Sequence, residues 1–136
     1  MAGVELRYLY VGCAETGAAL AAWLGLPGAR LRWRFERFGA VVAAVDTGRP
    51  PVVLLADHRR AGSVLPIYGV DDLASATDAL NGRGWASVVG PLETPEGPAV
   101  VLAGPGGAEL ALLRVDRPDV LDRAYAERAD RQAVPQ

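Results

Sequence analysis

The fold is decided by residues 65–115, which read LPIYGVDDLASATDALNGRGWASVVGPLETPEGPAVVLAGPGGAELALLRV. The opening LPIYGVDD is typical of a strand. The following LASATDALNGRG is typical of a helix, with Leu73, Ala76 and Leu80 on one face and glycines at its end. WASVVG then predicts a strand that breaks at Pro91, and PAVVLAG and AELALLRV predict two more strands. The order is therefore β-α-β-β-β.

Residues 4–56 repeat this order. VELRYLYVGC predicts a strand, AETGAALAAWLGLPG a helix of about three turns, and AVVAAVD and PPVVLLAD two short apolar strands. Between them ARLRWRFERFG alternates with period two, which places Leu31, Trp33 and Phe35 on one side of a strand. Shifted by 59 residues, Val11 falls on Val70, so the two halves form a weak internal repeat.

The double pattern resembles the vicinal oxygen chelate superfamily of glyoxalases, bleomycin-resistance proteins and extradiol dioxygenases. The resemblance covers about Val4 to Val115, and its most characteristic part is G-P-x-E-T-P-x-G at residues 90–97. The family's Asp-Pro-Asp-Gly-Asn turn is reduced here to GPGGA at residues 104–108. The resemblance implies an α+β fold class. Two βαβββ modules would form cupped, mostly antiparallel mixed sheets with helices on the convex side and the ligand on the concave side.

The chain of 136 residues has the length of one domain. We expect the first module at about 4–60, the second at about 61–115 and a helical tail at 116–136. Within this tail, DRPDVLDRAYAERADRQ predicts a short C-terminal helix, because Val120, Leu121 and Tyr125 have helical spacing.

Composition excludes several classes of function. The net charge of -2 argues against a nucleic-acid-binding module, and the single cysteine excludes an internal disulfide. The one histidine, His58, excludes sites with two histidine ligands from one chain, and the absence of lysine excludes Schiff-base chemistry. The sequence carries no targeting signal and no apolar run long enough to span a membrane, so we expect a cytoplasmic protein.

The resemblance also implies positions for a divalent metal. Enzymes of the family bind it with His, Glu or Gln from the first and last strand of each module, and spacing maps these positions to Leu6, Val53, Leu65 and Ala111. These side chains offer no oxygen or nitrogen donor to a hard cation. We therefore expect no metal, no other cofactor and no catalytic residue of the family type.

A concave face with apolar residues at these positions is either filled or a pocket for an apolar ligand. By the family's strand parity, Leu6 and Val53 also point into the cup. The predicted ligand-binding residues are Tyr8, Tyr10, Trp33, Phe35, Leu65, Ile67 and Glu109. The leading hypothesis is metal-independent binding or sequestration of a small aromatic or apolar molecule, resembling antibiotic-binding resistance proteins, in a homodimer.

Two other functions stay open: a glyoxalase-like lyase, isomerase or dioxygenase with an atypical site, or a regulatory domain with a filled cup. His58 beside Asp57 could be a general base or a solvated linker residue. Cys13 could be a reactive thiol at a helix start or a structural substitute for the family's capping Asp. Four arginines within residues 30–37 could bind an anion or simply lie along an exposed strand. For His58, Cys13 and the arginines alike, the purely structural interpretation is favoured.

Overall fold

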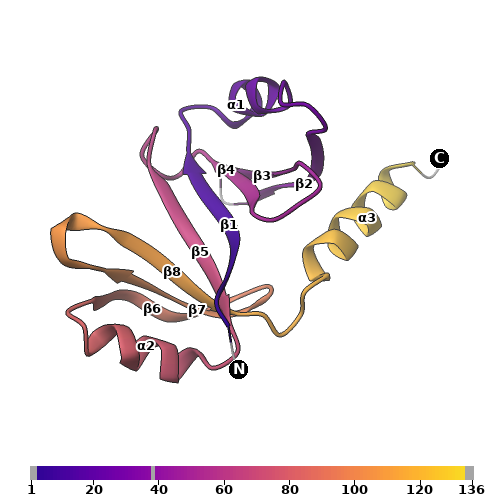
Figure 1. The fold of residues 1–136 in the computed structure, drawn as a ribbon. Helices are drawn as coiled ribbons and strands as arrows, with labels where there is room; N and C mark the ends of the chain where they lie inside the picture. The colour runs from indigo at the N-terminus through magenta and orange to yellow at the C-terminus, as the bar shows by residue number, and fades with distance from the viewer. Residues whose placement is uncertain (1–2, 38, 134–136) are drawn as a thin grey trace.

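The computed structural model describes residues 3–37 and 39–133 of the chain, and its ribbon is drawn in Figure 1. The first module contains β1 (Glu5–Gly12), α1 (Thr16–Trp23), β2 (Arg30–Arg37), β3 (Ala40–Asp46) and β4 (Val52–Ala56). The second contains β5 (Val64–Val70), α2 (Leu73–Asn81), β6 (Ala86–Thr94), β7 (Gly97–Ala103), a 3₁₀ turn (Pro105–Gly107) and β8 (Glu109–Arg114). The last element is α3 (Val120–Ala133).

All eight of these strands belong to one mixed sheet in the order β2-β3-β4-β1-β5-β8-β7-β6. Within each module the first and last strands pair in parallel, β1 with β4 and β5 with β8. The remaining pairs are antiparallel, including the β1–β5 pair that joins the two modules. The predicted fold class is confirmed: an α+β protein of repeated β-α-β-β-β order with a mostly antiparallel mixed sheet.

The two module helices begin at acidic caps. In α1 the cap is Glu15, whose carboxylate accepts hydrogen bonds from the backbone N–H groups of Gly17 and Ala18. The prediction that Cys13 takes the place of a capping Asp is therefore wrong. In α2 the cap is Asp72, which accepts from the N–H of Ser75 at 3.0 Å.

The lengths and faces of these helices follow partly from the sequence. Helix α1 has 8 residues, about a turn fewer than predicted, and it ends at Trp23 just before Gly25, whose N–H binds the carbonyl of Ala22 at 3.1 Å in a tight turn. In α2 the predicted apolar face is confirmed, since Leu73 is buried against the sheet and Ala76 and Leu80 pack beside it.

Irregularities in two strands change which side chains share a face. The pairing of β2 with β3 shifts register between Leu31 and Trp33. As a result Leu31 packs in the cluster under α1, whereas Trp33 and Phe35 lie on the opposite side of the sheet. The prediction that all three share one side is wrong, because the extra residue of a bulge reverses the alternation.

The predicted break of β6 at Pro91 is also wrong. Strand β6 continues to Thr94, with a register shift between Val89 and Leu92 and a positive φ of 94° at Gly90. A proline is tolerated there because β6 is the edge strand of the sheet and the residue lies at an irregularity.

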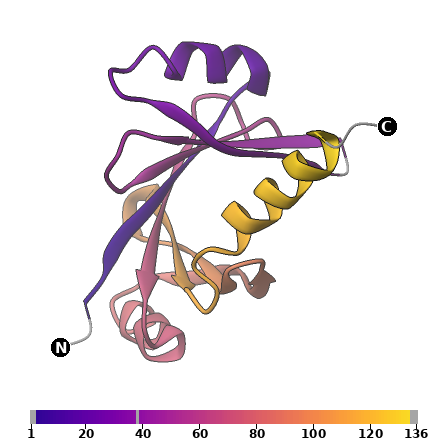
Figure 2. The ribbon, with the colours of Figure 1, turned by 90° about the vertical axis from the view of Figure 1, so that its right-hand side faces the viewer.

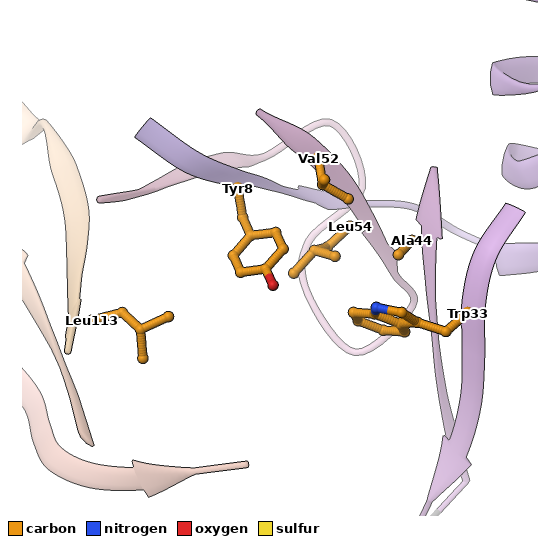
Figure 3. Packing of buried hydrophobic residues seen from close by; sticks show 6 residues of the cluster. All are labelled: Tyr8, Trp33, Ala44, Val52, Leu54 and Leu113. Carbon is orange, nitrogen blue, oxygen red and sulfur yellow. The ribbon is translucent and has the colours of Figure 1, made fainter. Parts of the chain in front are cut away.

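The face of the sheet opposite α1 and α2 carries the aromatic side chains, and we call it the inner face. Its buried cluster consists of Tyr8, Trp33, Ala44, Val52, Leu54 and Leu113. Figure 3 shows Leu54 between the rings of Tyr8 and Trp33, with Leu113 approaching from the second module. The two other clusters lie between the sheet and the module helices, one under α1 and one under α2.

Helix α3 packs on the inner face of the first module. Figures 1 and 2 show α1 and α3 on opposite sides of strands β2 to β4. Leu121 and Tyr125 of α3 pack against the inner-face cluster. Within residues 3–37 and 39–133, no helix has both the length and the apolar character that a membrane crossing requires.

Candidate functional site on the inner face

Register places the inner-face side chains in rows across the sheet. Trp33 of β2 is paired with Ala44, Ala44 with Leu54, Leu54 with Tyr10, and Tyr10 with Leu65 of β5. Because paired residues of neighbouring strands present their side chains to the same face, this row crosses five strands. The alternation therefore gathers bulky rings from β1 and β2 over small residues of β3.

The structure brings five of the seven predicted ligand-binding residues into one cluster. Tyr8 and Trp33 are buried there, with 6% and 4% exposure, and Tyr10, Phe35 and Ile67 are half-buried around them. Leu65 is buried in the same row as Tyr10. Glu109 is exposed at the start of β8 and is not part of this cluster. The buried rings form the floor of the inner face, and the half-buried ones are its reachable part.

Helix α3 adds residues that the sequence analysis did not assign to a site. The ring centroid of Tyr125 lies 5.9 Å from that of Phe35, edge to face, and Phe35 lies 5.4 Å from Trp33. Arg128 of the same helix lies over the Phe35 ring at 5.6 Å. The helical spacing of Leu121 and Tyr125 signalled an apolar face, but no pattern in the sequence said which surface that face would cover.

A two-bonded ion pair fixes α3 to strand β2. Arg32 donates from Nε and Nη2 to the two carboxylate oxygens of Asp122, both at 2.8 Å. The hydrogen bond to Arg32 lowers the pKa of Asp122, and the same contact raises the pKa of Arg32. Arg32 also lies 3.8 Å from Asp46, which pairs with Arg30 at 3.5 Å. The arginines at 30 and 32 thus have carboxylate partners within the chain.

A buried carboxylate, Glu96, joins three parts of the fold. It comes from the turn between β6 and β7 and is 4% exposed. Its Oε1 accepts a hydrogen bond from the Tyr8 hydroxyl at 2.7 Å, and its Oε2 accepts from Arg7 Nη2 at 2.7 Å. Its backbone carbonyl accepts from the N–H groups of Asp116 and Arg117. Glu96 therefore ties β1 to the β6–β7 turn and to the segment leading into α3.

This contact shifts the titration of its partners. Burial and the hydrogen bond to Glu96 raise the pKa of Tyr8. Burial lowers the pKa of Arg7, but the contacts with Glu96 and Tyr8 together outweigh it and the net shift is upward. Glu96 lies in the GPLETPEG segment that carries the family resemblance, and the sequence analysis gave it no role.

A second polar group lies where β4 leads toward β5. The hydroxyl of Tyr10 and Nε2 of His58 are hydrogen bonded at 3.0 Å, and Arg59 lies over the Tyr10 ring at 5.7 Å. Burial raises the pKa of Tyr10, and the positive charge of Arg59 opposes this shift. The carboxylate of Asp57 accepts from the N–H of Val41 at 3.0 Å. His58 is thus positioned by Tyr10 of the aromatic cluster, while the Asp57 carboxylate is hydrogen bonded to the backbone of β3.

The residues at the four implied metal positions do not fit a divalent cation. Leu6 is paired with Tyr68, which packs toward α2, because β1 shifts register between Leu6 and Tyr8. Val53 packs under α1. The prediction that both point into the cup is therefore wrong. Leu65 and Ala111 follow the inner-face alternation of Ile67 and Leu113, but neither has a donor atom.

The polar groups near these positions also disfavour a cation. The Glu96 carboxylate is already bound by the guanidinium of Arg7 and the hydroxyl of Tyr8. Among the described residues, no group of three or more His, Cys, Asp and Glu side chains is placed to hold a metal ion. We derive no chemistry through a metal at this site.

The other sequence candidates lie away from the aromatic cluster. Cys13 lies 3.8 Å from the Thr16 hydroxyl in the cluster under α1, where it is half-buried. Arg34 is exposed on β2, and the side chain of Arg37 lies outside the described part of the structure. Neither Cys13 nor Arg34 adds a group to the inner face.

An apolar hollow lies on the other side of the sheet, under α2. It has a volume of about 340 Å³, and its walls include Tyr68, Ala76, Ala79, Leu80 and Leu110. The hollow is the alternative binding location that any ligand experiment has to separate from the inner face.

This arrangement of two βαβββ modules is the vicinal oxygen chelate, or glyoxalase-like, fold. A hypothetical protein from Bacillus halodurans C-125 matches with a TM-score of 0.71 and 12% identity over 85% of this chain and 96% of that one. Methylmalonyl-CoA epimerase from Mycobacterium tuberculosis matches with a TM-score of 0.69 and 14% identity over 84% of this chain and 89% of that one.

A third similar structure is a variant methylmalonyl-CoA epimerase from Streptomyces coelicolor in complex with 2-nitronate-propionyl-CoA. It matches with a TM-score of 0.65 and 12% identity over 83% of this chain and 98% of that one. No protein-family model matches the chain, and no curated protein sequence matches it. At these identities the likeness shows the fold, and function has to be argued from the residues of this chain.

Proposed function

We propose that this protein binds a small aromatic or apolar molecule on its inner face without a metal. The observation that carries the proposal is the set of half-buried rings, Tyr10, Phe35 and Tyr125, over a buried aromatic floor. Rings of this kind offer large apolar surfaces together with hydroxyl groups. Structures of the same fold bind small molecules, among them CoA esters, which is compatible with a ligand on this face.

Stacking and apolar burial both contribute free energy to such binding. An aromatic pair contributes about 0.5–1.5 kcal/mol beyond the burial of its area. The burial of about 150 Å² of apolar surface contributes roughly 4 kcal/mol before the costs of association. Contacts with three rings bring the gross gain to at most about 8 kcal/mol. Micromolar binding corresponds to about 8 kcal/mol net of the association costs, so it requires a ligand that buries more apolar surface than one ring.

The experiment uses the neutral fluorescent probe N-phenyl-1-naphthylamine with the whole chain. We expect saturable binding that Phe35→Ala weakens by about tenfold, the size expected for one aromatic contact. The matched control is Ala79→Leu, which fills the hollow under α2 and leaves the inner face unchanged. Loss of binding in Ala79→Leu but not in Phe35→Ala would place the probe under α2 and refute the proposal.

A non-catalytic regulatory domain is the second candidate, and one observation favours it. Leu121 and Tyr125 of α3 already cover part of the inner face, in the way that a bound ligand would. In that case aromatic probes find no site, and Phe35→Ala changes stability alone. The same probe titration decides between the two functions.

We also propose that the protein assembles as a homodimer through the edge strand β6. Val88, Val89 and Leu92 of this strand are exposed, with 52%, 47% and 40% of their surfaces open. No other strand among the described residues pairs with the outer edge of β6, and a second copy related by a two-fold axis can pair with it in antiparallel fashion.

A further inference from the structure

We propose that the ligand of the inner face carries an acidic group next to its aromatic part, and that Arg59, with His58 beside it, binds this group. The inference rests on the proposed function, since it names the chemical class of the molecule bound there. It is carried by one half-buried arginine at the border of the aromatic cluster.

The position of Arg59 follows from the chain direction. Strand β4 ends at Ala56, and the next residues leave the sheet beside β1. There the Arg59 guanidinium lies 5.7 Å from the ring centroid of Tyr10, and His58 is hydrogen bonded to the hydroxyl of the same tyrosine at 3.0 Å. Tyr10 itself packs against the inner-face cluster. A molecule stacked on this cluster therefore has two nitrogen-bearing side chains at its border.

The other half-buried arginines of the inner face are paired with carboxylates. Arg7 binds Glu96 at 2.7 Å, and Arg32 binds Asp122 at 2.8 Å. Among residues 3–36 and 39–128, whose side chains the structure describes, Arg59 has no carboxylate within ion-pair distance. Its buried Nε has no hydrogen-bond partner there, which is also true of the Nε of Arg7. The neighbouring carboxylate of Asp57 is directed to the N–H of Val41.

A half-buried guanidinium without an anion has lost water and gained little in return. Burying a polar N–H without a partner is unfavourable, and buried charges are normally paired. The contact with the Tyr10 ring supplies only part of the stabilising free energy that an ion pair would supply. A carboxylate or sulfonate on the ligand would be the ion-pair partner that Arg59 lacks, because a guanidinium binds such groups through two parallel N–H hydrogen bonds.

The purely structural alternative is that Arg59 only covers the Tyr10 ring. A cover of this kind stabilises the fold and has no preference for the charge of a ligand. An anion-binding residue changes the discrimination between a charged and an uncharged form of the same ring system. The two roles therefore differ in a measurable ratio of affinities.

The test compares two probes with the same rings, 8-anilinonaphthalene-1-sulfonate and the uncharged N-phenyl-1-naphthylamine. We expect wild-type protein to bind the sulfonate at least tenfold more tightly than the neutral probe. Arg59→Gln should abolish this preference and change the affinity for the neutral probe less than threefold. The control Arg60→Gln removes the same charge from the next, exposed residue and should keep the preference.

Three results would overturn the inference: a sulfonate preference that survives in Arg59→Gln, an equal loss for both probes in that variant, or the same loss in Arg60→Gln. Failure of the underlying function looks different. If Phe35→Ala leaves the affinities for both probes unchanged, neither probe binds on the inner face. If Phe35→Ala weakens both and Arg59→Gln changes neither, the aromatic site stands and only the acidic group is refuted.

Discussion

Replacing Glu96 by alanine should be among the most destabilising single changes in this protein. The substitution removes one partner of a buried ion pair, leaving Arg7 without a counter-charge and the Tyr8 hydroxyl without an acceptor. Breaking a buried pair in this way costs about 3–5 kcal/mol. We expect the lower end, about 3 kcal/mol, because the Arg7 side chain is 24% exposed and water can reach it.

The matched control lies in the same hairpin. Glu93 forms an ion pair with Arg117 at 2.9 Å, but 67% of the Glu93 side chain is exposed. Glu93→Ala should therefore cost less than about 1 kcal/mol. The comparison keeps the residue type, the partner type and the hairpin the same, so the differences are burial and the hydrogen bond from the Tyr8 hydroxyl.

Urea unfolding followed by tryptophan fluorescence measures both costs, with the slope of the transition checked for constancy. A loss of about 3 kcal/mol corresponds to a fall of roughly 10 °C in Tm for a chain of this size. Adding Arg7→Met to Glu96→Ala should restore part of the stability, since the unpaired charge is then gone. A Glu96→Ala variant within 1 kcal/mol of wild type would refute the role of Glu96 as the joint between the modules.

The remaining predictions concern α3, Trp33 and assembly. Asp122→Asn should destabilise the protein above about pH 5. Because the pKa of Asp122 is lowered in the folded state, the difference in the free energy of unfolding between wild type and variant should shrink as the pH falls below about 4. Urea unfolding between pH 3 and pH 7 measures this difference. Trp33→Ala should cost about 3–5 kcal/mol, since Trp33 is 4% exposed, and a melting temperature close to wild type would show that its ring is not core. Sedimentation should show a dimer that Leu92→Lys dissociates; a monomer in wild type at high micromolar concentration contradicts the β6 interface.

The repeated order of elements was predictable because short apolar strands and glycines recur at similar distances in both halves. The apolar face of α2 followed from spacing alone. The faces of Leu6 and Leu31 did not, because a bulge adds one residue without altering the alternation of letters around it. The period-two pattern of β2 is equally regular whether or not Arg32 is the extra residue.

For the candidate site, the sequence predicted which rings share a face but not what covers them. Tyr8, Tyr10, Trp33 and Phe35 lie together because their strands pair in register. The docking of α3 depends on long-range contacts such as Arg32–Asp122, which join residues 90 positions apart. Glu96 was missed for a similar reason, since its two side-chain partners lie 89 and 88 positions away in the chain.

The covering of the inner face by α3 has a consequence for biosynthesis. Strands β1 to β4 leave the ribosome well before residues 120–133 are translated, so the rings of Trp33 and Phe35 emerge without their final neighbour. Exposed apolar surface on an incomplete sheet invites association with other nascent chains. The packing of the inner face is therefore completed late, when α3 reaches a surface made by strands that were synthesised first.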